Sequence, residues 1–265
     1  MSVRLTGISI YPIKAAGGIP LQHARVEERG LELDRRCMIV DSANVFMTQR
    51  VYPRLALISV KARDPFLHVT APGTDDLRLA VPEPAALSVR VRVWDDLVDA
   101  LSFPREADYW FSSFLEIPCR PVYMPDTTRR IADTEHAHGQ HTVSFADGYP
   151  FLLISEESLG LLNTKLPEPL PMNRFRPNLV VAGCEPHAED SWHHIRIGGV
   201  EFLLVRPCAR CVVTTVDQET GVKGREPLRT LGTYRQQNGK ILFGQNMITK
   251  TTGVVRVGDP VAVLQ

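Results

Sequence analysis

Two cysteines separated by two residues, Cys208 and Cys211, are the side chains most suited to chemistry. A structural zinc site needs four ligands, and no second CxxC pair is present to complete one. A thioredoxin-type pair opens a helix, whereas the β-branched run VVTTV at 212–216 predicts a strand. The remaining interpretation is that one of the two cysteines is a thiolate ligand. Arg206 and Arg210 are near it in the sequence, and their positive charge favours the ionised thiol. Two purely structural cysteines remain the alternative.

The other three cysteines, Cys37, Cys119 and Cys184, stand singly in apolar or mixed stretches. An iron–sulfur cluster would need four thiolates close together, so none is expected. The odd total of five cysteines also argues against a disulfide framework. We therefore expect these three to be small buried residues.

Basic residues recur where loops meet the expected strands, and such junctions are common places for sites. They are Lys14, Arg35, Arg36, Arg174 and Arg176. Ammonium and guanidinium groups that converge from separate loops suit a phosphate dianion, although each taken singly is typical of a solvated surface charge. The polar residues expected to lie in loops, in turns or on the surface are His136, His138, His141, Asp147, His193, His194 and Asp217.

Composition describes an ordinary globular chain of 265 residues, with 44% hydrophobic and 23% charged residues. Thirty basic residues balance thirty acidic ones, which points away from nucleic acid and from an anionic membrane surface as partners. No apolar run approaches the roughly 20 residues that span a bilayer. The alternating N-terminus does not resemble a signal peptide, so we expect a cytoplasmic protein.

The first half is expected to consist mainly of strands. Residues 3–10 and 55–60 approach a period of two, and LSVRVRVW at 87–94 alternates strictly. An amphipathic helix over 105–116 follows, between Pro104 and Pro118. A domain boundary is expected near residue 120, where the polar loop begins.

The second half mixes short strands with short helices. Ser155 is the predicted N-cap of a helix that carries a leucine stripe, and a further short helix is expected around Leu228. Strands are expected at 178–182, 194–197 and 200–205, with a Gly-Gly hairpin between the last two. Short strands, tight turns and few helices favour barrels over a wound parallel sheet.

Seven motifs occur in a recognisable order. They are YPIK at 11–14, LDRR at 33–36, FADGYPFLL at 145–153, FRPNLVV at 175–181, RPCARCVVTTVD at 206–217, FGQN at 243–246 and VRVGDPV at 255–261. In this order the chain resembles the MOSC proteins that carry an N-terminal MOSC-associated barrel. That class includes the mitochondrial amidoxime-reducing component and its bacterial homologues, and the resemblance covers essentially the whole chain.

The resemblance implies a mainly β, mixed α/β fold with two barrel-like lobes and a few short helices, divided into 1–120 and 121–265. It implies a molybdenum–molybdopterin cofactor between the lobes, with the second cysteine of the CxxC pair as molybdenum ligand and catalytic residue. The positions that match this ligand and the cofactor-binding residues are Cys211, Lys14, Arg35, Arg176, Asn178, Arg210 and Asn246. Ala15 replaces a serine that is frequent in the family, so one hydroxyl contact to phosphate is missing.

The implied activity is reduction of N-hydroxylated compounds, namely hydroxylamines, amidoximes and N-hydroxylated bases. The chain carries no cysteine set for a cluster, so the electrons are expected from a separate flavoprotein or ferredoxin-type donor. Two alternatives remain. The chain is a carrier or binding module for the cofactor or for sulfur, or a thiol-redox protein that uses Cys208 and Cys211.

Overall fold

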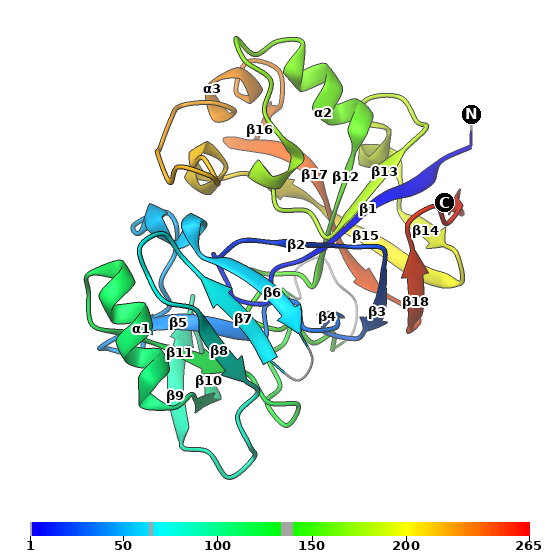
Figure 1. The fold of residues 1–265 in the computed structure, drawn as a ribbon. Helices are drawn as coiled ribbons and strands as arrows, with labels where there is room; N and C mark the ends of the chain where they lie inside the picture. Colours follow the sequence, from blue (N-terminus) through cyan, green and yellow to red (C-terminus); the bar gives the residue numbers. More distant parts are fainter. Residues whose placement is uncertain (1, 64–65, 134–139) are drawn as a thin grey trace.

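The computed structural model describes residues 2–63, 66–133 and 140–265, and it shows two lobes that meet along one side (Figure 1). Strands dominate both lobes, and the α-helices of the described part are α1 (Arg105–Leu115), α2 (Glu156–Asn163) and α3 (Leu228–Leu231). This confirms the expected mainly β fold with few short helices. None of these helices has both the length and the apolar character that crossing a membrane requires.

The larger lobe is organised by a nine-stranded sheet in the order β19-β14-β15-β17-β12-β13-β1-β2, with β16 paired to β17. Arg4 bridges Pro260, which brings β1 back beside the start of β19 and gives the sheet its barrel-like curl. Its strands are β1 (Arg4–Ile10), β2 (Ile19–Leu21), β12 (Phe151–Ser155), β13 (Leu179–Ala182), β14 (His194–Ile197), β15 (Val200–Ala209), β16 (Gln236–Gln237), β17 (Lys240–Thr249) and β19 (Val261–Val263).

The smaller lobe packs a sheet in the order β5-β11-β10-β9 against a sheet in the order β6-β7-β8, with α1 alongside. A third small sheet, β18-β3-β4, joins the last part of the chain to the first and packs on the core of the larger lobe. The strands of these three sheets are β3 (His23–Glu27), β4 (Gly30–Leu31), β5 (Cys37–Asp41), β6 (Ser59–Arg63), β7 (Phe66–Thr70), β8 (Leu77–Ala80), β9 (Ser88–Val93), β10 (Asp96–Ser102), β11 (Cys119–Tyr123) and β18 (Gly253–Arg256).

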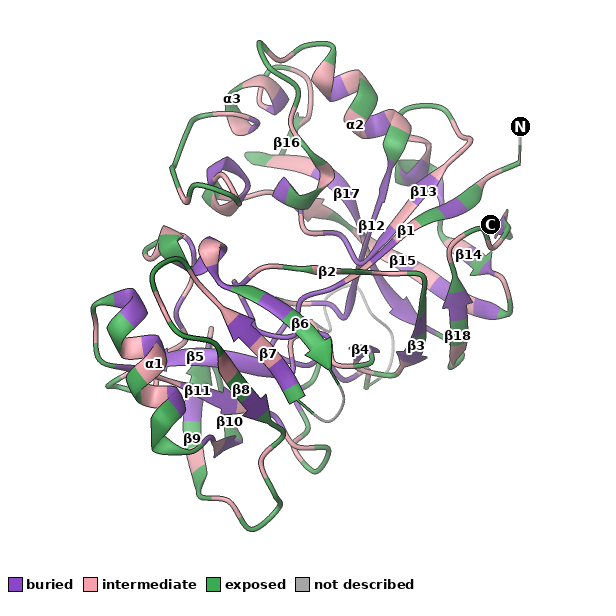
Figure 2. Ribbon diagram, viewed as in Figure 1, coloured by how far each residue is buried: buried purple, intermediate pink, exposed green. Residues whose placement is uncertain are grey.

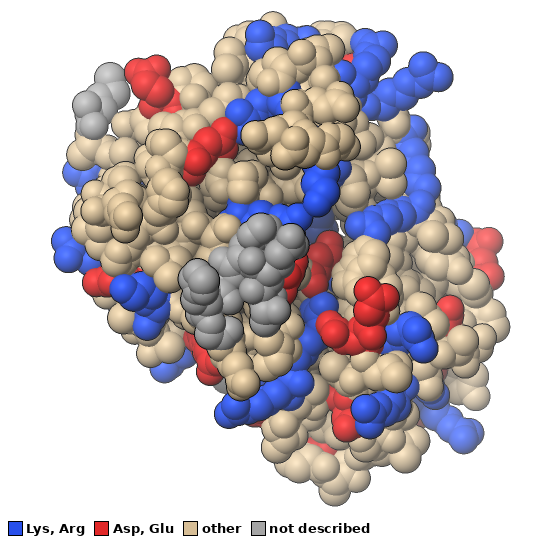
Figure 3. All heavy atoms as spheres, turned by 180° about the vertical axis from the view of Figure 1, so that it is seen from behind, with Lys and Arg blue, Asp and Glu red and all other residues tan. Residues whose placement is uncertain are grey.

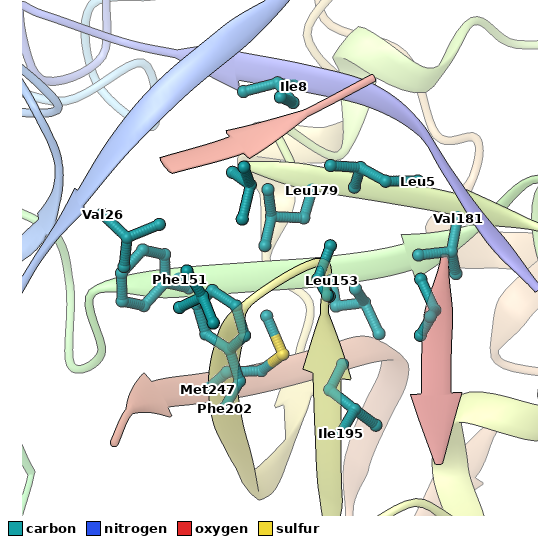
Figure 4. Close-up of a cluster of buried hydrophobic side chains, with 14 of the residues drawn as sticks. Leu5, Ile8, Val26, Phe151, Leu153, Leu179, Val181, Ile195, Phe202 and Met247 are labelled. Atoms are coloured by element: carbon teal, nitrogen blue, oxygen red, sulfur yellow. The ribbon is translucent and has the colours of Figure 1, made fainter. Parts of the chain in front are cut away.

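Each lobe has its own hydrophobic core, and the buried residues in Figure 2 concentrate on the strands rather than on the outer loops. In the larger lobe, side chains from β1, β12, β13, β15 and β17 point toward one another (Figure 4). Phe151 and Phe202 meet there edge to face, with ring centroids 5.3 Å apart. Because side chains alternate along each strand, one face of the curled sheet is buried in this core.

Several local predictions are confirmed. The alternating run forms β9, the amphipathic segment forms α1, and Ser155 caps α2 by accepting from the Ser158 amide. The strand expected at 55–60 is wrong in its first half, because Pro53 begins a 3-10 helix, Pro53–Leu57, before β6 starts. Proline fixes φ at a helical value and donates no ladder hydrogen bond, which favours this helical turn.

The strand predicted for VVTTV is also wrong, because Val212–Thr215 forms a 3-10 helix. The Thr214 hydroxyl donates to the Cys211 carbonyl at 3.0 Å, and the Thr215 hydroxyl donates to the Val212 carbonyl at 2.8 Å. These local side-chain bonds compete with a sheet ladder and override the β preference of the branched residues. The chain thus turns sharply just after Cys211.

Candidate active site

One pocket between the two lobes contains all seven residues that the motifs single out. The lobes meet there, and Lys and Arg side chains gather along this boundary in the space-filling view (Figure 3). The seven are Lys14, Arg35, Arg176, Asn178, Arg210, Cys211 and Asn246. Their roles stay predictions, but side chains that lie up to 232 positions apart in the sequence, from Lys14 to Asn246, share one cavity.

Lys14 lies in the turn that follows β1, where its backbone amide donates to the Cys37 carbonyl at 2.8 Å. Its buried ammonium group donates to the Phe145 carbonyl at 2.7 Å and to the Asp147 carboxylate at 2.5 Å. Burial lowers the pKa of Lys14, and the Asp147 carboxylate opposes that effect. The ammonium group is thereby held at the pocket wall by strong charge-assisted bonds.

Two guanidinium groups lie over the ring of Tyr11, Arg35 at 4.5 Å and Arg176 at 4.2 Å from its centroid. Both arginines adopt positive φ, +50° and +56°, a region that L-residues seldom occupy outside turns and functional sites. Arg35 pairs with the buried carboxylate of Asp34 at 2.5 Å. It also donates to the Asn178 side chain at 3.2 Å. Arg35 is therefore neutralised within the protein.

Arg176 has no carboxylate partner in the described residues, and burial lowers its pKa to about 10. Its nearest polar contact is the Gln218 side-chain oxygen at 3.4 Å, and its buried Nη2 atom has no hydrogen-bond partner. A buried donor without a partner is costly unless something absent from the protein itself supplies an acceptor. A buried guanidinium N–H without a partner is the kind of donor that suits an anionic acceptor.

The CxxC pair lies where β15 ends. Arg210 donates to the Cys208 sulfur at 3.0 Å and to the Phe175 carbonyl at 2.6 Å. Of the two arginines expected beside Cys211, Arg210 bonds the Cys208 sulfur, and Arg206 pairs with Asp133. A cation that sequence reasoning did not place there, Arg50 of the smaller lobe, lies 3.5 Å from the Cys211 sulfur. All five cysteines, these two included, are free thiols.

Arg50, Trp94 and Asp147 are among the pocket residues that sequence reasoning missed. Asp147 was expected to be a plain turn residue, but it accepts from both Lys14 and the Trp94 indole, the latter at 3.2 Å. The Arg50 guanidinium lies 4.5 Å over the Trp94 ring. No spacing in the sequence signals these contacts, although an arginine directly after the polar pair Thr48-Gln49 is the kind of residue that loops use in sites.

Other residues that the sequence raised lie away from the pocket. Arg36 donates to the Met124 carbonyl, and Arg174 donates to the Thr214 carbonyl at 3.0 Å, so both serve the fold. His194 pairs with Glu201 at 2.9 Å, while His136 and His138 lie outside the described residues. Within the part of the chain that the structure describes, no group of three His, Cys, Asp or Glu side chains is placed to hold a metal ion.

Comparison with known proteins agrees with this arrangement. Residues 2–118 match the MOSC N-terminal beta barrel domain and residues 140–262 match the MOSC domain. The chain is 36% identical to mitochondrial amidoxime-reducing component 1 of Homo sapiens over 96% of its length and 81% of that protein. It is 37% identical to the Mus musculus protein (96% and 80%) and 34% identical to component 2 of Rattus norvegicus (95% and 80%). The chain therefore belongs to the MOSC family, in the branch that contains the mitochondrial amidoxime-reducing components.

Proposed function

We propose that this chain is a molybdenum-cofactor-dependent reductase of N-hydroxylated compounds: hydroxylamines, amidoximes and N-hydroxylated bases. The observation that carries the proposal is the pocket itself. The Cys211 thiol shares this pocket with Arg35 and Arg176, whose guanidinium groups both lie over the Tyr11 ring. These two arginines and Tyr11 are called the Tyr11 cluster. The relatives' names, amidoxime-reducing components, support the choice of reaction.

The chemistry of the pocket fits a pterin cofactor that carries a phosphate. Three guanidinium groups in the pocket, those of Arg50, Arg176 and Arg210, have no carboxylate partner among the described residues. A phosphate monoester carries close to two negative charges at neutral pH, and a thiolate adds one. These charges would balance the three cations, and the phosphate would supply the acceptor that the buried Arg176 Nη2 lacks.

Each residue has a role in this proposal. Arg176 and Lys14 bind the phosphate, Arg35 orients Arg176 across the Tyr11 ring, and Asn178 and Asn246 line the remaining wall. Cys211 provides a soft thiolate ligand of the type that molybdenum prefers. The cofactor, when bound, supplies the two-electron redox chemistry. Arg210 fixes Cys208 through the 3.0 Å contact, which leaves Cys211 as the ligand sulfur.

The electrons are proposed to come from a separate protein of the flavoprotein or ferredoxin type. In the described residues no cysteine cluster and no metal-binding group offers a second redox centre. The substrate is proposed to bind beside Trp94 and Arg50, which line the pocket with Cys211.

Molybdenum analysis tests the proposal. The wild type, Cys211→Ala and the matched control Cys208→Ala are expressed in a host that makes the cofactor, and molybdenum per chain is measured with reduction of benzamidoxime by a viologen donor. We expect about one molybdenum atom per wild-type chain, activity in Cys208→Ala, and loss of activity in Cys211→Ala. Molybdenum without reduction of any N-hydroxylated compound would overturn the reductase and favour a carrier. Full activity in Cys211→Ala would overturn the ligand assignment.

A further inference from the structure

Arg50 reaches the candidate site from the lobe opposite Cys211. It lies in the loop between β5 and the 3-10 helix Pro53–Leu57, and its Nη2 atom is 3.5 Å from the Cys211 sulfur. Its backbone is fixed at both ends, because its amide donates to the Thr48 hydroxyl at 2.9 Å and its carbonyl accepts from Lys223. The loop that carries Arg50 is therefore fastened to both lobes.

Trp94 holds the guanidinium group in place. The Arg50 Cζ atom lies 4.5 Å over the Trp94 ring, and that ring is fixed by Phe46, with centroids 4.8 Å apart, and by the hydrogen bond to Asp147. Trp94 itself adopts φ +56° in the hairpin between β9 and β10. A bulky residue rarely occupies this region, and such strained residues cluster at functional sites.

Arg50 differs from the other cations of the pocket. Lys14 and Arg35 each bond a carboxylate, at 2.5 Å in both cases, and Arg176 belongs to the Tyr11 cluster. Among the described residues Arg50 contacts a sulfur and an aromatic ring but pairs with no carboxylate. An arginine stays protonated at any physiological pH, so its remaining N–H groups can only donate. They stand beside Cys211, where the proposed reaction takes place.

We propose that Arg50 is a catalytic residue that donates hydrogen bonds to the oxygen of the N-hydroxy group while the N–O bond breaks. This inference rests on the proposed reductase function. The N–O bond of the substrate breaks and an N–H bond forms. Two electrons from the donor protein and two protons from water convert the N-hydroxy compound into the amine-level product and water. Arg50 keeps its own protons and stabilises the negative charge that builds up on the leaving oxygen.

Kinetics of Arg50→Gln and Arg50→Lys test this role, with Arg54→Gln as the matched control. Arg54 lies four residues away on the same segment, pairs with Glu116 and does not line the pocket. Rates are expressed per molybdenum atom. We expect kcat for benzamidoxime to fall about 100-fold in Arg50→Gln, because removing one preorganised hydrogen-bond donor to a developing oxyanion has an effect of this size. Added guanidinium ion should restore part of that loss, which a purely structural role would not allow.

A second measurement uses the cofactor-free protein and needs no enzymatic activity. Alkylation of Cys211 is followed by mass spectrometry with iodoacetate, which is anionic, and with iodoacetamide, which is neutral. Both reagents require the thiolate, so the ratio of their rates cancels the amount of thiolate and reports the local positive charge. We expect this ratio at Cys211 to fall on the order of tenfold in Arg50→Gln. It should not change at Cys208, which faces Arg210, or in Arg54→Gln.

The outcomes separate this inference from the proposed function. An unchanged alkylation ratio in Arg50→Gln, or a kcat within threefold of wild type, overturns the role of Arg50 while leaving the reductase intact. A wild type that binds molybdenum but reduces no N-hydroxylated compound overturns the reductase and this role together. The proposed role of Arg50 is supported if Arg50→Gln lowers both the alkylation ratio at Cys211 and kcat, and if added guanidinium ion restores part of kcat.

Discussion

Replacing the two arginines that lie over Tyr11 should change stability in opposite directions. Burial lowers the pKa of Arg176 from its usual, higher value to about 10, so the folded protein disfavours its charged form at neutral pH. One pKa unit corresponds to about 1.4 kcal/mol, which gives roughly 3 kcal/mol, and partial solvent exposure reduces this to about 1–2 kcal/mol. Because the pKa of a cation is lowered, this cost is present at pH 7 and disappears only above about pH 10.

Arg35 presents the reverse case. Burial alone would lower the pKa of Arg35, but the Asp34 carboxylate at 2.5 Å outweighs it and the pKa is raised. Only 1% of the Asp34 side chain is exposed, so Arg35→Met would leave a buried charge without its partner. Breaking such a pair costs about 3–5 kcal/mol. Arg176→Met, in contrast, should stabilise the cofactor-free protein by about 1–2 kcal/mol.

Urea unfolding of cofactor-free protein at pH 7 measures both changes, and molybdenum content is measured on the same variants made with cofactor. We expect both variants to lose molybdenum, so that Arg176→Met becomes more stable and less able to bind. The reasoning would be refuted if Arg176→Met were less stable than wild type by more than about 1 kcal/mol. It would equally fail if Arg35→Met changed stability by less than about 1 kcal/mol.

Three further substitutions have outcomes that follow from their contacts. Lys14 holds the pKa of Asp147 below its usual 3.8, although desolvation alone would raise it. The resulting stabilisation is present above pH 3.8 and is lost only as the pH falls below that value, so the stability gap between wild type and Asp147→Asn should stay constant from pH 7 to about pH 5 and narrow below about pH 4 in urea titrations. Glu189 is fully buried and accepts from Ser158 at 2.7 Å, so Glu189→Ala should cost about 2–4 kcal/mol of unfolding free energy. Gly244→Ala would place a Cβ 2.8 Å from the Leu153 carbonyl at φ +80°, and thermal unfolding should show a loss of about 2–4 kcal/mol.

Local structure was predictable where one rule acted alone. Strict alternation at 87–94 led to β9, and a serine ahead of a leucine stripe led to α2. The predictions were wrong where a local contact competed with propensity, as in VVTTV, where the Thr214 hydroxyl bonds the Cys211 carbonyl. A prediction from periodicity cannot detect such a bond, because it uses only the type of each side chain. It contains no information on the backbone carbonyl that the side chain reaches three residues earlier.

The candidate site was predictable only in part, and the reason is distance along the chain. Motif order brought out Cys211 and Lys14, which the structure puts in one pocket. It gave no indication that Asp147 bonds Lys14 across 133 residues or that Arg50 faces Cys211 across 161. Each of these contacts depends on how the lobes are joined, and no window of the sequence contains both partners.

The way the lobes are joined explains how such contacts stay fixed. β1, from the start of the chain, pairs with β13 in the larger lobe, and β18, from its end, pairs with β3. Lys14 lies in the turn just after β1 and reaches the pocket wall. The position of Lys14 therefore depends on the pairing of β1 with β13, a strand from the second half of the sequence. Because ladder hydrogen bonds set register to the residue, β1 cannot slide along the larger lobe without breaking them. The spacing between Arg50 on one lobe and Cys211 on the other is held by hydrogen bonds that cross between the lobes beside them, because Lys223 donates to the Arg50 carbonyl and Gln218 donates to the Gln49 side chain.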